Sequence, residues 1–106
     1  MVVLLDERRE DGSRLRMTAR LDDDRTLHIE GRDLGPVTKF VSPDGEYEYS
    51  YRIEATDLPA TVAVLGGEPG TDVLDLLRQR WCGLAAYDIG AALRDGGVRF
   101  RFWRWP

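Results

Sequence analysis

The sequence has little of the chemistry that enzymes and metalloproteins concentrate in their sites. Its 106 residues include one cysteine, Cys82, and one histidine, His28. A single cysteine excludes an intrachain disulfide and is typical of a reducing compartment. Cys82 and His28 are 54 positions apart, with no metal-ligand spacing around either. We therefore expect no metal and no cofactor.

Catalytic signatures are equally scarce. Cys82 comes after an expected helix, a position unfavourable for a nucleophilic thiolate, so we predict a buried structural side chain there. The glycine pairs Gly66-Gly67 and Gly96-Gly97 fit helix ends and not a phosphate-binding loop. No catalytic residue is predicted, and the sequence favours a protein that is not an enzyme.

Long hydrophobic runs are also missing. The longest N-terminal run, Val2 to Leu5, has four residues, whereas a secretory segment needs roughly 7–15 and a membrane span about 20. We expect a cytoplasmic protein without a membrane partner. The net charge is −4, with −8 in residues 1–77 and +4 in residues 78–106. An acidic chain disfavours general nucleic-acid binding but leaves a basic patch near the C-terminus.

What the chain does contain is alternation of apolar and polar residues at the period of a β-strand. Such runs cover residues 15–21, 26–31, 46–54 and 98–105, and helical spacing covers residues 57–65, 72–81 and 84–93. The order predicts an α+β fold: one antiparallel sheet of four to five strands, two to three helices on one face, and the C-terminal strand inserted in the sheet. We expect one domain over residues 1–106, in which residues 1–12 form an extension or an edge strand.

Two of these strands carry more aromatic side chains than a scaffold requires. Tyr47, Tyr49 and Tyr51 share one face of the third run, as a core face or as a stacking platform. Arg99, Arg101, Trp103 and Trp105 share one face of the last run, and arginine and tryptophan are enriched in binding hot spots. These seven residues are the candidate interaction surface. Trp103 and Trp105 are either exposed or cover a second small core.

Four segments together resemble a family of small actinobacterial proteins of unknown function. They are residues 27–36, LHIEGRDLGP; 46–51, EYEYSY; 72–77, DVLDLL; and 97–105, GVRFRFWRW. The resemblance extends over residues 15–105 and implies no activity and no site residues. In size and charge alone the chain is similar to immunity proteins of bacterial toxin systems.

Three functions follow, in order of preference. The first is a protein-interaction module of the immunity or antitoxin kind, with a protein partner. The second is a small-molecule binder or weak enzyme with a pocket lined by Tyr49, Tyr51 and Trp81. The third is contact with single-stranded nucleic acid through Arg99, Arg101, Arg104 and the tryptophans, a partner that the acidic composition makes the least favoured.

Overall fold

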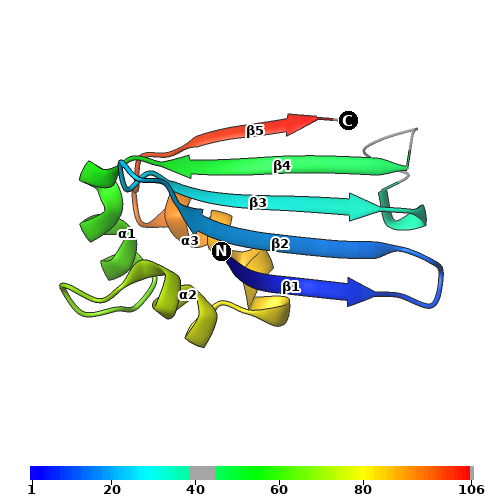
Figure 1. Ribbon diagram of the computed structural model, residues 1–106, viewed down its shortest axis with the longest axis horizontal. Coiled ribbons are helices and arrows are strands. Elements are labelled where there is room, and N and C mark those ends of the chain that lie inside the picture. Colours follow the sequence, from blue (N-terminus) through cyan, green and yellow to red (C-terminus); the bar gives the residue numbers. More distant parts are fainter. Residues whose placement is uncertain (39–44, 106) are drawn as a thin grey trace.

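The computed structural model describes residues 1–38 and 45–105 and contains one open antiparallel sheet with helices against one face (Figure 1). The strands are β1 (Val2–Arg8), β2 (Arg14–Leu21), β3 (Leu27–Leu34), β4 (Glu46–Ile53) and β5 (Arg101–Trp105). They lie side by side in chain order, with β1 and β5 at the two edges. The predicted α+β class and antiparallel sheet are confirmed, and the C-terminal strand joins the sheet beside β4.

The helical layer covers the face that the alternation marks as apolar. Its elements are α1 (Leu58–Val64), α2 (Val73–Arg80) and α3 (Ile89–Asp95), with 3-10 turns η1 (Pro36–Thr38), η2 (Ala55–Asp57) and η3 (Gly83–Asp88). Asp72 caps α2, because its Oδ1 accepts a hydrogen bond of 3.0 Å from the Asp75 amide. We call the covered side of the sheet the helical face and the other side the open face.

The core fills the space between the helical face and the helices. Leu15, Met17 and Ala19 on β2 point into it, as do Leu27 and Ile29 on β3, and all five are buried. From the helices, the buried core residues are Leu58, Val62, Val73, Leu76, Leu77, Ile89 and Leu93. The period-two pattern therefore sets which face of the sheet is covered.

Two glycines make room for tyrosine side chains of β4. A Cβ on Gly31 of β3 would lie 2.0 Å from Cζ of Tyr49, and a Cβ on Gly90 of α3 would lie 2.3 Å from the hydroxyl oxygen of Tyr51. Contacts this short are not tolerated between real atoms. The two tyrosine rings therefore occupy space that any larger residue at either position would take.

Two sequence expectations need correction. The last strand begins at Arg101 rather than at residue 98. Gly97 has a positive φ of 71°, and the Val98 amide donates a hydrogen bond of 3.0 Å to the Leu93 carbonyl, so residues 97 and 98 still belong to the turn after α3. Cys82 is exposed rather than buried; its thiol donates to the Arg78 carbonyl at the end of α2.

The sequence also predicts a short helix that begins at Pro36 and continues through Phe40 and Val41, followed by a turn from Ser42. Pro36 begins η1 in the structure, and residues 39–44 of this prediction lie outside the described residues. Among residues 1–38 and 45–105, no helix is long and apolar enough to cross a membrane.

The fit of Tyr49 over Gly31 gives the first prediction. Gly31→Ala should lower the free energy of unfolding by about 1–3 kcal/mol, because the added methyl group displaces the tyrosine ring. Urea denaturation of the wild type and the variant measures this loss. In a Tyr49→Ala background the same substitution should cost much less, because the ring is gone. An equal cost in both backgrounds would contradict this account.

Candidate functional site: the open face and the tyrosine pocket

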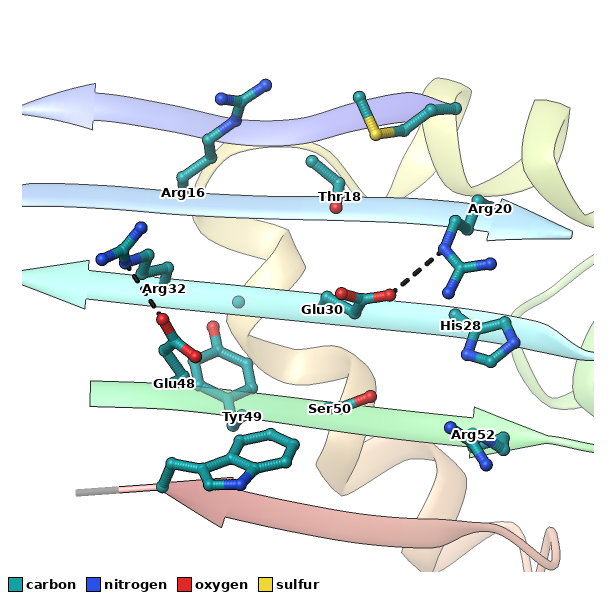
Figure 2. Close-up of a pocket in the computed structure, with 13 residues that line it drawn as sticks. Arg16, Thr18, Arg20, His28, Glu30, Arg32, Glu48, Tyr49, Ser50 and Arg52 are labelled. Carbon is teal, nitrogen blue, oxygen red and sulfur yellow. Dashed lines mark hydrogen bonds and ion pairs between the residues drawn. The ribbon is translucent and has the colours of Figure 1, made fainter. Parts of the chain in front are cut away.

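The open face is a polar surface with no helix over it in the described part of the chain. Figure 2 views it from the solvent side, with polar side chains of β2, β3 and β4 in front and helices behind the sheet. On β2 to β5 its residues are Arg14, Arg16, Thr18, Arg20, His28, Glu30, Arg32, Leu34, Glu46, Glu48, Ser50, Arg52, Arg101, Trp103 and Trp105. A hollow of about 570 Å³ lies across its middle.

Arginine dominates the charge of this face. Six arginines of β2 to β5 face three glutamates there, although the chain as a whole has a net charge of −4. Arg20 Nε lies 3.2 Å from Glu30 Oε1, and Arg32 reaches Glu46 at 3.1 Å and Glu48 at 3.2 Å. The acidic excess of the protein therefore lies elsewhere, and the open face is locally positive.

Three arginines of the open face have no carboxylate partner within the described residues. They are Arg16, Arg52 and Arg101. The guanidinium carbon of Arg52 lies 4.7 Å from the ring centre of Trp103, within the range of a cation–π contact. Trp105 is 51% exposed, which is high for so large an apolar side chain. The face thus presents free guanidinium groups beside accessible indole surface.

His28 lies on the open face and is nevertheless buried. Its Nε2 is 2.6 Å from Oδ2 of Asp22, in the turn between β2 and β3. The hydrogen bond from His28 lowers the pKa of Asp22 below its usual value. Cys82 follows α2 on the other side of the sheet. The chain's single histidine and single cysteine therefore do not form a catalytic pair.

A second site lies on the helical face, between the sheet and the segment η3–α3. This cavity of about 200 Å³, the tyrosine pocket, is lined by Asp33, Tyr47, Tyr49, Tyr51, Tyr87 and Phe102 among others. The tyrosines of β4 come from alternate positions, and Tyr87 comes from η3. Ring centres of Tyr47 and Tyr49 are 5.6 Å apart, and those of Tyr51 and Phe102 are 4.9 Å apart.

Burial controls the ionisation of the groups in this pocket. It raises the pKa of Asp33, an effect that the positive charge of Arg9 partly offsets. Burial also raises the pKa of Tyr49, and it raises the pKa of Tyr87 to about 12. Both phenols are therefore protonated at neutral pH. Oδ1 of Asp33 is buried and accepts no hydrogen bond from any described residue.

The sheet separates the predicted site residues into two groups. Tyr47, Tyr49 and Tyr51 lie on the helical face, where the latter two pack against the core. Arg101, Trp103 and Trp105 lie on the open face.

The remaining candidates lie elsewhere. Arg99 precedes β5, and its Nη2 is 3.0 Å from Asp57. Arg104 is opposite Tyr49, so it belongs to the helical face. Trp81 does not line the tyrosine pocket; its Nε1 donates to the Leu65 carbonyl at 2.9 Å. Trp81 is therefore not part of a pocket with Tyr49 and Tyr51, whereas Arg99 lines a hollow with Arg52 and Arg101 beyond the start of β5.

Sequence reasoning missed two members of the tyrosine pocket. Asp33 is separated from Leu27, Ile29 and Gly31 by even numbers of positions, so it lies on the same, apolar side of β3. A carboxylate at such a position was the signal that could have identified Asp33 from the sequence. Tyr87 lies within residues 84–93, where helical spacing predicted one helix, but the structure has the 3-10 turn η3 up to Asp88, so that spacing did not give the direction of Tyr87.

Comparisons with protein-family models, curated proteins and solved structures find no match for this chain. The family resemblance stays a prediction. In the part of the chain that the structure describes, no group of three or more histidine, cysteine, aspartate or glutamate side chains is placed to hold a metal ion.

The raised pKa of Asp33 predicts a pH dependence of stability. The folded protein holds the Asp33 proton more tightly than the unfolded chain, whose reference pKa is 3.8, so Asp33 destabilises the fold as pH rises through its folded pKa. Asp33→Asn removes this effect. We expect the variant to gain unfolding free energy relative to the wild type, and this gain should be larger at pH 7 than at pH 3.5. Urea denaturation of both proteins at both pH values measures it. A difference independent of pH would show that the carboxylate is not desolvated.

Proposed function

We propose that this protein is a protein-interaction domain whose contact surface is the open face and whose partner presents an acidic surface. The observation that carries the proposal is the combination of unpaired Arg16, Arg52 and Arg101 with the exposed indole of Trp105 on a sheet face that the helices leave uncovered.

The composition of the open face fits the centre of a protein interface. Arginine and tryptophan are the side chains most often found as binding hot spots, because they combine large contact area with directed hydrogen bonds. Arg52 is already oriented by its contact with Trp103, so less conformational freedom is lost when a partner carboxylate binds it. Glu30, Glu46 and Glu48 hold neighbouring arginines in fixed positions and set a charge pattern that a partner must match.

The dimensions of the open face are also sufficient. Three of the five strands have eight residues, and strands lie about 4.8 Å apart with a rise of about 3.4 Å per residue. The face therefore measures roughly 24 Å across the strands and 27 Å along them, without the additional area that protruding side chains contribute. This is close to the roughly 800 Å² that each partner contributes to a stable interface.

A protein partner accounts for this charge pattern better than single-stranded nucleic acid. Three glutamates lie among the six arginines, and the whole chain is acidic, so a polyanion would meet repulsion along much of its path. Of the three arginines expected to contact nucleic acid, Arg104 lies on the helical face and Arg99 is paired with Asp57, so neither is free beside the tryptophans.

An inhibitor of the immunity or antitoxin kind would act by this type of contact, and that more specific function stays part of the proposal. We also propose a cytoplasmic location, which the exposed thiol of Cys82 favours because thiols persist in a reducing compartment.

The test compares capture by two variants. The wild type, Trp105→Ala and Arg94→Ala are immobilised and exposed to lysate of the source cells, and the captured protein is identified, purified and titrated by calorimetry. Trp105→Ala should weaken binding by about 2 kcal/mol, as expected for a hot-spot residue. Arg94, exposed at the end of α3 on the helical side, is the matched control and should leave the affinity unchanged.

Two results would overturn the proposal. One is a stoichiometric partner that binds wild type and Trp105→Ala equally. The other is absence of any stoichiometric partner together with tight, salt-sensitive binding of short single strands, which would assign the open face to nucleic acid.

A further inference from the structure

We propose that the tyrosine pocket is a second, independent binding site and that its ligand is a small organic ammonium ion with an apolar body. The site lies on the helical face, so the inference does not depend on what binds the open face. Its support comes from three features of the pocket: an unpartnered carboxylate, a wall of aromatic rings, and space that the packing preserves.

The carboxylate defines the charge of the ligand. Among the described residues that line the pocket, Asp33 is the one charged side chain; Arg9, whose positive charge acts on Asp33, is not in the lining. Oδ1 of Asp33 is buried and receives no hydrogen bond from the described residues. A buried acceptor without a donor is unfavourable, and a positively charged N–H group is a strong donor for it at neutral pH. An ammonium group at this position would supply both the hydrogen bond and the opposite charge, whereas an anionic ligand would meet the Asp33 carboxylate.

The aromatic wall suits the same ligand. Tyr47, Tyr49, Tyr51 and Tyr87 line the pocket with phenol rings, and the faces of such rings attract cations. The rings of Tyr49 and Tyr51 meet edge to face, with centres 6.3 Å apart and planes at 82°. Such an arrangement presents ring surfaces in several directions, so both an ammonium group and an adjoining apolar body can contact them.

The size of the pocket limits the ligand. Its volume is about 200 Å³, and an apolar cavity of about 150 Å³ in another protein is known to hold benzene. The tyrosine pocket therefore has room for an aromatic ring with a short chain, or an alkyl group of similar volume. Phenethylammonium has this size and charge, which makes it a suitable probe.

The test is a titration of the full chain at pH 7 with phenethylammonium and with 2-phenylethanol, which has the same skeleton without the positive charge. Backbone amide shifts in two-dimensional NMR report both the affinity and the location. Phenethylammonium should bind saturably with a dissociation constant on the order of a millimolar or below. The shifted amides should include those of Gly31 and Gly90, which contact the rings of the pocket.

Two variants distinguish a specific site from general adsorption. Asp33→Asn should weaken phenethylammonium binding by about tenfold or more and leave 2-phenylethanol unaffected, because only the charged hydrogen bond is lost. Asp95→Asn makes the same chemical change at an exposed position, the last residue of α3, and should bind as the wild type does. The proposal is overturned by the absence of saturable binding, by equal affinity for the neutral alcohol, or by wild-type affinity in Asp33→Asn.

Discussion

The burial of one apolar face of the sheet beneath the helices is the constraint on which the arrangement of this protein depends. Leu15, Met17 and Ala19 of β2 share that face with Leu27 and Ile29 of β3, and all five are buried. Tyr49, which lies over Gly31, and Tyr51, which reaches Gly90 in α3, are on the same side. In the described part of the chain the helices cover this side alone, so most polar side chains of the other side remain exposed. The tyrosine pocket and the open face therefore lie on opposite sides of the same strands.

The fold class could be predicted from the sequence because period-two alternation is a local property. In β2 to β4 it also gave the correct face for each apolar residue. The start of β5 could not be predicted this way. Val98 and Phe100 continue the alternation of the strand, but the positive φ of Gly97 and the ion pair of Arg99 with Asp57 hold this segment outside the sheet. These features depend on where α1 begins and where α3 ends, which a strand pattern does not encode.

The candidate sites were less predictable because they depend on what covers each face. Whether Trp105 is exposed follows from the absence of a described element over the open face, and no local pattern contains that information. Asp33 gave a signal through its parity on β3, but its significance required Tyr87 from a distant turn to close the pocket. Arg99 has the parity of the tryptophans but precedes the first residue of β5, and its partner Asp57 comes from η2, so parity alone could not give its contacts.

Energetics distinguish the two sites. In each ion pair of the open face both side chains are exposed to solvent. Exposed pairs contribute about 0–1 kcal/mol each to stability, so the charges of this face could change with little effect on folding. Asp33 is different, because a half-buried carboxylate with an unpartnered oxygen lowers the stability of the fold at neutral pH. An apolar residue would pack there without that loss. A carboxylate at this position therefore does not serve the packing of the core, and this is the energetic argument for the ligand site that we propose.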